Sequence, residues 1–168
     1  MSITTRIRPC LWFNDQGEEA ARFYTGIFPN SRIVRVTHFS DAGQEIHGRP
    51  AGSVMTVVFE LDGTTFTALN GGPLFTFNEA VSFEVHCDSQ AEIDQYWARL
   101  GEGGDPRAQQ CGWLKDRFGV SWQVVPAQMD ALFADPDSPA TRRAMNAMLQ
   151  MKKLDIAALQ RAYDGVEV

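Results

Sequence analysis

The chain has 168 residues and a formal net charge of −6 at pH 7, with 44% hydrophobic and 21% charged residues. This length suffices for one domain or for two small modules that share a core. The negative charge disfavours binding to nucleic acid or to an anionic membrane surface, and no apolar stretch is long enough to span a membrane. The three cysteines (Cys10, Cys87 and Cys111) are irregularly spaced, which indicates reduced thiols in a cytoplasmic protein.

A strand–helix unit occurs twice in the sequence, at an offset of 73 residues (88 − 15). In each copy an apolar run ends at an aspartate, Asp15 or Asp88, and an aromatic pair follows eight and nine positions later. Further strand-like runs come after each copy. The repeat predicts an α+β fold of two βαβββ modules in one domain, followed by a helical C-terminal extension. The expected ranges are 5–72 and 78–126 for the modules, 1–128 for the domain and 129–168 for the extension.

The first module shows strong signals at its helix and at one hairpin. Asp15, with Glu18 three residues later, predicts a capping box at the start of the helix. Asp62-Gly63 between two apolar runs predicts a tight β-hairpin. The elements expected in chain order are a strand (7–13), a helix (15–28), a strand (32–39), a long mobile loop (40–52) and two strands (53–61 and 64–70).

The second module repeats the order without the long loop. Its first strand alternates, so apolar residues at odd positions are expected under the helix, while Ser82, Glu84 and His86 face the other side. In the extension, Ser138-Pro139 and Asp155 predict helix starts. The elements expected before the extension are a strand (81–87), a helix (89–100) and two strands (109–115 and 120–125).

Three segments carry a resemblance to a known family: AARFYTGIF (20–28), NGGPLFTFNEAVSFEVHC (70–87) and CGWLKDRFGVSWQVVP (111–126). With the duplication, they resemble the PhnB-like (demethylubiquinone methyltransferase-like) branch of the glyoxalase/bleomycin-resistance/dioxygenase, or vicinal oxygen chelate, superfamily. The resemblance covers about residues 5–126 and implies that two sheets form a cup around one small-molecule site. Superfamily members commonly complete the cup by pairing modules, and the C-terminal helices are rich in Met, so we expect a homodimer.

The methyltransferase label finds no support in the residues. Binding of S-adenosylmethionine usually uses a glycine-rich turn between a strand and a helix. No G-x-G-x-x-G pattern is present, and Gly71-Gly72 is followed by Pro73 rather than by a helix.

Metal-binding members of the superfamily hold a divalent ion with His and Glu side chains. The resemblance places these ligand positions at Arg8 or Pro9, at Ala80 or Ser82, and at Gln123, which are not a metal-ligand set. We therefore expect neither a metal nor another cofactor.

Glu84 and His86 share one face of a strand, and two interpretations are open. They can form a metal or acid–base pair, or Glu84 pairs with a cationic neighbour while His86 lies at the solvent rim. The second interpretation is favoured.

The predicted ligand site lies in the cup, with the loop 40–52 as its lid. Arg8 could hold a carboxylate or phosphonate and Trp12 could stack on a planar ligand; equally, Trp12 could fill the core while Arg8 pairs with Glu84. Cys111 beside Lys115 could be an activated thiolate, and Asp116 is expected to start a turn. The predicted site residues are Arg8, Trp12, Asn70, Glu84, Trp113 and Gln123.

Three functions compete at this point. The favoured one is a metal-free protein that binds a hydrophobic or planar small molecule. The second is a glyoxalase-superfamily enzyme (a lyase, isomerase or dioxygenase) with an unusual metal site or none. The third is an interaction module whose pocket is filled by its own aromatic side chains.

Overall fold

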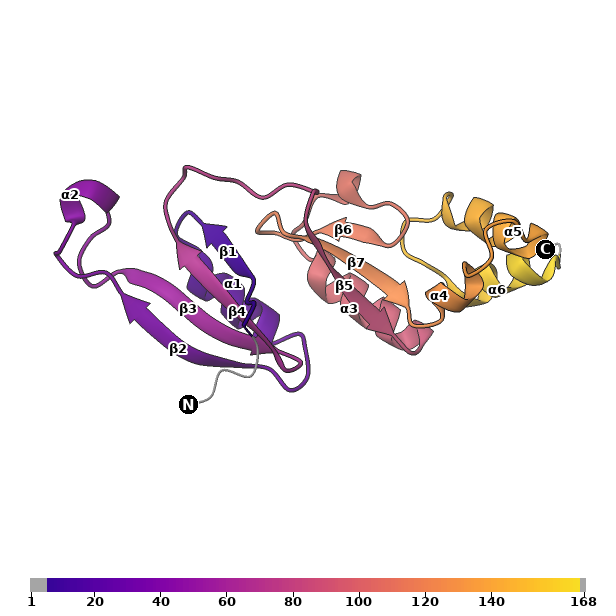
Figure 1. Ribbon diagram of the computed structural model, residues 1–168, viewed down its shortest axis with the longest axis horizontal. Coiled ribbons are helices and arrows are strands. Elements are labelled where there is room, and N and C mark those ends of the chain that lie inside the picture. The colour runs from indigo at the N-terminus through magenta and orange to yellow at the C-terminus, as the bar shows by residue number, and fades with distance from the viewer. Residues whose placement is uncertain (1–5, 167–168) are drawn as a thin grey trace. The chain divides into compact units, whose positions relative to one another are not determined.

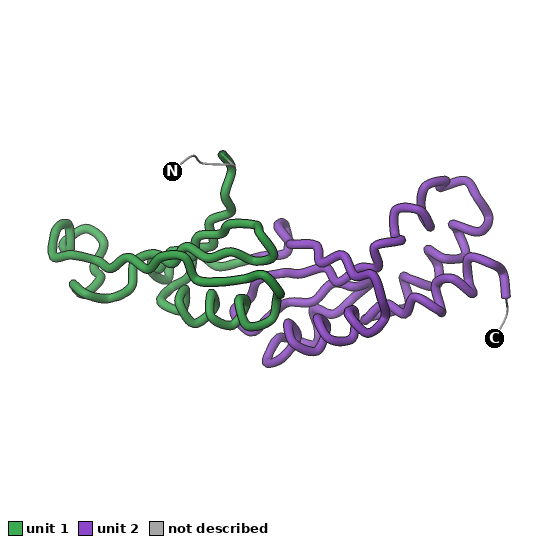
Figure 2. The backbone as a smooth tube through the Cα atoms, turned by 90° about the horizontal axis from the view of Figure 1, so that it is seen from below, with its two compact units in different colours: residues 1–77 green, residues 78–168 purple. Residues whose placement is uncertain are grey.

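A computed structural model describes residues 6–166 of the chain (Figure 1). The backbone divides into two compact units, one ending at Phe77 and the other beginning at Asn78 (Figure 2). Each unit combines a β-sheet with helices, so the predicted α+β fold of two modules with C-terminal helices is confirmed. The assignment of residues 1–128 to one domain and 129–168 to an extension stays a prediction.

The first unit has the predicted βαβββ order. In its sheet the strands are arranged β1-β4-β3-β2, with β1 parallel to β4 and the other pairs antiparallel. The turn at Asp62-Gly63 has positive φ at both residues, as the predicted tight hairpin requires. The elements are β1 (Cys10–Phe13), α1 (Gly17–Thr25), β2 (Arg32–His38), α2 (Gln44–His47), β3 (Val54–Leu61) and β4 (Thr64–Asn70).

Helix α1 packs on one face of this sheet, and the burial of side chains along β1 alternates because of that packing. Leu11 and Phe13 are buried, whereas Cys10 is exposed and Trp12 is half-buried. On the helix, Tyr24 is fully buried, and its ring stacks near that of Phe59 with centroids 6.3 Å apart.

The start of α1 differs from the prediction. The helix begins at Gly17, and its N-cap is Gln16 rather than Asp15, with no capping hydrogen bond from the Gln16 side chain. Instead, the Gly17 amide donates to the Asn70 side-chain oxygen at 2.8 Å. A Cβ at position 17 would lie 2.7 Å from that oxygen, so the absence of a side chain lets Asn70 approach. The capping group therefore comes from β4 rather than from the neighbouring sequence.

The loop 40–52, predicted as a mobile segment, contains the short helix α2. The His47 ring packs against Phe39 with centroids 4.7 Å apart, and its Nδ1 accepts from the Arg49 amide at 3.0 Å. The Arg49 guanidinium donates to the carbonyl of Asn14.

The second unit has one strand fewer than the predicted βαβββ module among its described residues. Its sheet order is β5-β7-β6, with β5 parallel to β7. Between α3 and β6 the chain forms a 3₁₀ turn in which the Asp105 side chain accepts from the Arg107 amide and Pro106 takes the first position. The elements are β5 (Ser82–Cys87), α3 (Gln90–Gly101), η1 (Pro106–Ala108), β6 (Trp113–Lys115) and β7 (Ser121–Pro126).

The predicted alternation is confirmed within β5, whereas Val81, which was expected under the helix, precedes the strand and is 68% exposed. Cys87 is buried on the side of α3, where burial, followed by the charges of Glu92 and Asp88, raises the pKa of its thiol to about 11. Glu84 and His86 are exposed on the opposite face. The three cysteines of the chain are free.

The predicted strand 109–115 is interrupted by a tight turn. Gln110 and Trp113 exchange two backbone hydrogen bonds (2.8 and 3.1 Å), and the two residues between them, Cys111 and Gly112, have φ of 50° and 84°. Positive φ at both central residues is the geometry of a two-residue hairpin turn. Strand β6 therefore begins only at Trp113.

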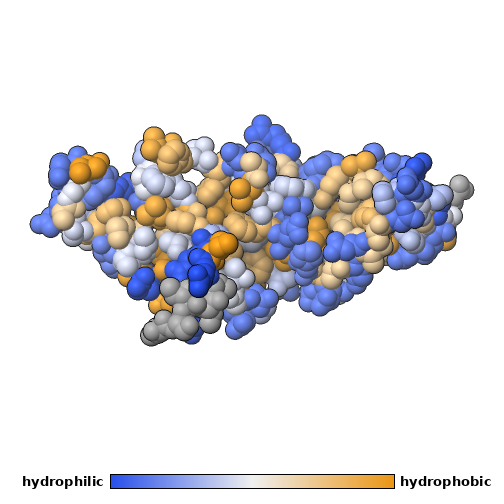
Figure 3. Space-filling view, viewed as in Figure 1, coloured by the Kyte–Doolittle hydropathy of each residue, from blue (hydrophilic) through white to orange (hydrophobic). Residues whose placement is uncertain are grey.

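Three helices follow β7: α4 (Met129–Leu132), α5 (Pro139–Met148) and α6 (Ile156–Asp164). The predicted caps are confirmed, since Ser138 accepts from the Ala140 amide at 3.2 Å and Asp155 from the Ala158 amide at 2.8 Å. Figure 3 shows apolar surface among the polar side chains over this region. Among residues 6–166, no helix has the length and apolar character needed to cross a membrane.

Candidate functional site

A pocket of about 230 Å³ opens on the face of the second unit's sheet that α3 leaves uncovered. Its floor comes from β5, β6 and β7, and one wall comes from α4 and α5. The lining residues are Glu84, His86, Cys111, Trp113, Gln123, Val125, Met129, Asp130, Phe133 and Met148.

Three of the predicted site residues form one row across this floor. In the strand register, Gln123 lies opposite Glu84 on one side and opposite Trp113 on the other. Residues paired in register project from the same face of a sheet. The sheet therefore presents a carboxylate, an amide and an indole side by side to the pocket.

Glu84 and His86 pair with each other at the rim. His86 Nε2 lies 3.1 Å from Glu84 Oε2, and the two side chains are 52% (His86) and 56% (Glu84) exposed. The exposure of His86 agrees with its expected place at the solvent rim, whereas Glu84 pairs with His86 and not with the separate cationic neighbour that this interpretation expected. The arrangement also leaves an acid–base pair at the edge of the pocket.

The residues present do not fit a divalent metal ion. At two of the positions that the family resemblance assigns to ligands, Gln123 Nε2 donates to Ser82 Oγ at 2.9 Å, so an amide and a hydroxyl bind each other. Neither brings the charge that a Lewis-acid ion requires. Within residues 6–166, no three His, Cys, Asp or Glu side chains are grouped as a metal site.

Cys111 lines the pocket from the tight turn rather than from a strand. Its sulfur lies 3.3 Å from Gln110 Nε2. Lys115, the cation expected beside Cys111, forms an ion pair with Glu79. The hydrogen bond from the Lys115 ammonium group lowers the pKa of the Glu79 carboxyl. The arrangement does not support an activated thiolate paired with Lys115.

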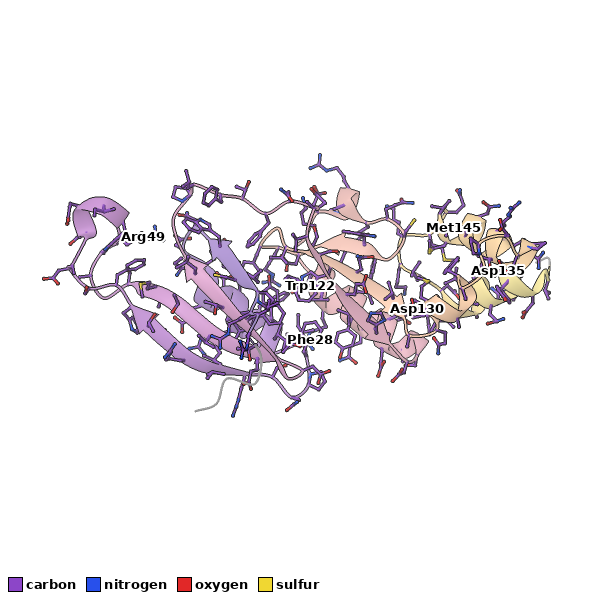
Figure 4. All side chains as sticks on the ribbon, viewed as in Figure 1. Phe28, Arg49, Trp122, Asp130, Asp135 and Met145 are labelled. Carbon is purple, nitrogen blue, oxygen red and sulfur yellow. The ribbon has the colours of Figure 1, made fainter. Side chains whose placement is uncertain are left out.

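The wall formed by the C-terminal helices was not anticipated. Figure 4 shows Asp130 on α4, close to the end of β7. The segment after α5 is fixed to the second module by the turn at residues 111–112, whose amides donate to the carbonyls of Met151 (2.9 Å) and Lys152 (2.8 Å). Gln110 Nε2 adds a bond to Leu149 O at 2.9 Å. The Met-rich stripe was visible in the sequence, but the sequence did not show which part of the protein this stripe contacts.

The other three predicted residues belong to the first unit, where two of them have structural partners. Asn70 is 4% exposed and binds both Gly17 N and Val54 O (3.1 Å). Trp12 Nε1 donates to the carbonyl of Gly72 at 2.9 Å, and its ring meets that of Phe75 edge-on at 4.9 Å. Arg8 is exposed. Their participation in ligand binding, under the loop 40–52, stays a prediction.

The fold is that of the glyoxalase-like proteins. FosX, a fosfomycin resistance protein from Mesorhizobium loti, has 17% identity and a TM-score of 0.54, over 80% of this chain and 100% of its own. Protein PA1353 from Pseudomonas aeruginosa has 23% identity and a TM-score of 0.56, over 73% and 98%.

The family follows from closer matches. The 3-demethylubiquinone-9 3-methyltransferase family matches residues 5–125. A putative 3-demethylubiquinone-9 3-methyltransferase, a PhnB protein from Bacillus cereus, is 32% identical over 73% of this chain and 100% of its own, with a TM-score of 0.62. The chain therefore belongs to this PhnB-like 3-demethylubiquinone-9 3-methyltransferase family, as the resemblance predicted. No curated protein matches the sequence.

Proposed function

We propose that this protein binds a small molecule in the pocket of its second unit, through side chains and without a metal ion. The observation that supports this is the row of Glu84, Gln123 and Trp113 on the floor of the pocket. Small-molecule sites typically join apolar walls to a few convergent polar groups. Here Trp113 offers a flat apolar face, and Gln123 and Glu84 offer hydrogen-bonding groups beside it.

The methyltransferase in the family's name is not part of this proposal. Both sheets are mixed, and in neither is a glycine-rich turn placed between a strand and the helix that follows it. Gly71 and Gly72 lead out of β4 into the segment that joins the two units. The geometry therefore lacks the usual binding turn for S-adenosylmethionine.

The Glu84–His86 hydrogen bond favours a second candidate, an enzyme that moves a proton on its ligand. A histidine and a carboxylate within hydrogen-bonding distance can act as general acid and base. Both candidates use the same pocket, and they differ only in whether the bound molecule leaves unchanged.

We expect a library of planar small molecules to contain compounds that raise the melting temperature of the protein, with the same shift in the presence of EDTA. For such a compound, Trp113→Ala should weaken binding by about 1–3 kcal/mol, because an aromatic contact is lost. Calorimetric titration of the folded variants measures this change. Val34→Ala serves as the control, because Val34 is 49% exposed and lies on β2 in the first unit.

The outcomes separate the candidates. A shift that EDTA abolishes, or an affinity unchanged in Trp113→Ala, would contradict the proposal of a metal-free site at this pocket. Mass spectrometry of the recovered ligand distinguishes binding from turnover.

We also propose a homodimer. Met145 on α5 and Leu149, the residue that caps the end of this helix, are 36% and 49% exposed, which leaves apolar surface for a second copy. Light scattering at micromolar concentration should give twice the mass of one chain, and Met145→Lys should shift the result towards one chain. A clean single-chain mass for the unaltered protein would reject the dimer.

A further inference from the structure

The pocket is lined by two carboxylates, Glu84 from β5 and Asp130 from α4, and by no Lys or Arg. Its one imidazole, His86, lies 3.1 Å from Glu84 and leaves Asp130 without a basic neighbour among the lining residues. The lysine at the end of β6, Lys115, is held by Glu79. An anionic ligand would therefore meet repulsion without a compensating lysine or arginine, whereas a positive charge would be attracted by both carboxylates.

The uncharged part of the lining suits the same kind of ligand. Trp113 and Phe133 supply aromatic rings, and Met129 and Met148 supply polarisable thioethers. A cation is attracted to the face of an aromatic ring, most strongly to that of tryptophan. Methionine adapts to irregular apolar shapes and makes favourable contacts with aromatic groups.

The wall that carries Asp130 lies outside the part of the chain that the family model matches, which ends at residue 125. Met129, Asp130, Phe133 and Met148 lie beyond that match. The second carboxylate and half of the apolar contacts thus come from the C-terminal helices.

We infer that the pocket binds an organic cation, an ammonium or a similar group attached to a flat apolar body, with the charge between Glu84 and Asp130 and the ring against Trp113. This inference rests on the proposed small-molecule function and specifies its ligand class. The C-terminal helices determine the specificity, because they supply Asp130.

The test uses three soluble probes that share a phenyl ring: benzyltrimethylammonium, benzyl alcohol and benzenesulfonate. Each is titrated at constant ionic strength while the indole N–H signal of Trp113 is followed by NMR, with Trp113→Phe to assign that signal. The cation should bind more tightly than the alcohol, and the sulfonate should not bind. Glu84→Gln and Asp130→Asn should each weaken binding of the cation about three- to tenfold, as expected for loss of one nearby charge.

Glu19→Gln is the matched control, because it removes the same charge from an exposed site on α1 and should leave the affinity unchanged. Equal binding of benzyl alcohol, or no effect of Glu84→Gln and Asp130→Asn, would overturn the inference and leave the proposed function standing. No response of Trp113 to any probe would also overturn it. Failure of the proposed function is seen separately, when no compound of the wider library binds at Trp113.

Discussion

Replacing Asp116 by alanine should lower the free energy of unfolding by about 3–5 kcal/mol, because three buried or partly buried donors lose their common acceptor. Asp116 is 3% exposed and lies in the turn between β6 and β7. Its Oδ1 accepts from the amides of Phe118 (2.8 Å) and Val120 (3.0 Å), and its Oδ2 accepts from Trp122 Nε1 (2.8 Å). Urea unfolding followed by circular dichroism measures the loss.

Asp116→Asn tests the hydrogen bonds with almost no change of shape. The amide has one acceptor oxygen, so its NH₂ group must face a donor, and we expect a loss of about 2–3 kcal/mol. Trp122→Phe removes the Trp122 Nε1 donor. This substitution should lower the free energy of unfolding less in the Asp116→Asn background than in the unaltered protein. A loss below about 1 kcal/mol for Asp116→Ala, or strict additivity in the cycle, would show that these bonds do not stabilise the fold.

The second large effect is expected for Gly104→Ala, which should lower the free energy of unfolding by at least about 3 kcal/mol through overpacking. A Cβ at position 104 would overlap the backbone carbonyl oxygen of Lys115. This oxygen cannot move away as a side chain can, because it belongs to the last residue of β6. Thermal or urea unfolding measures the change.

Gly101→Ala is the control three residues earlier. Its Cβ would have Gln109 Nε2 as its nearest neighbour, at 3.8 Å, and residue 101 ends α3. Alanine is favoured over glycine in a helix by about 1 kcal/mol, so this variant should be as stable as the parent or more stable. Equal stability of the two variants would contradict the steric explanation.

Both predictions concern the candidate site as well as stability. Gly104 and Asp116 hold the end of β6 and the turn into β7, and these two strands place Trp113 opposite Gln123. Variants at either position should therefore disturb ligand binding in proportion to their effect on folding. Variants at Glu84 or Asp130 should change affinity alone, since both side chains are exposed.

The local elements could be predicted from the sequence. Helix starts at Ser138 and Asp155 and the hairpin at Asp62-Gly63 depend on side chains and backbone within a few residues, so nearby sequence determines them. The alternation of apolar and polar residues in β5 likewise predicted Glu84 on the uncovered face of the sheet. A strand with a helix on one side must turn its apolar side chains towards that helix.

Other features depend on residues far apart in the chain, and only the tertiary structure decided them. The sequence predicts Asn70 as a polar residue of the ligand site. In the structure Asn70 caps α1 from 53 positions away, because a glycine at position 17 leaves room for its side chain. Asp130 and Met148 became pocket residues because the amides of the turn at 111–112 bind the segment that follows α5. The sequence by itself determined the repeated α+β modules and the floor of the pocket. Long-range hydrogen bonds, which no local pattern reveals, decided its wall and charge.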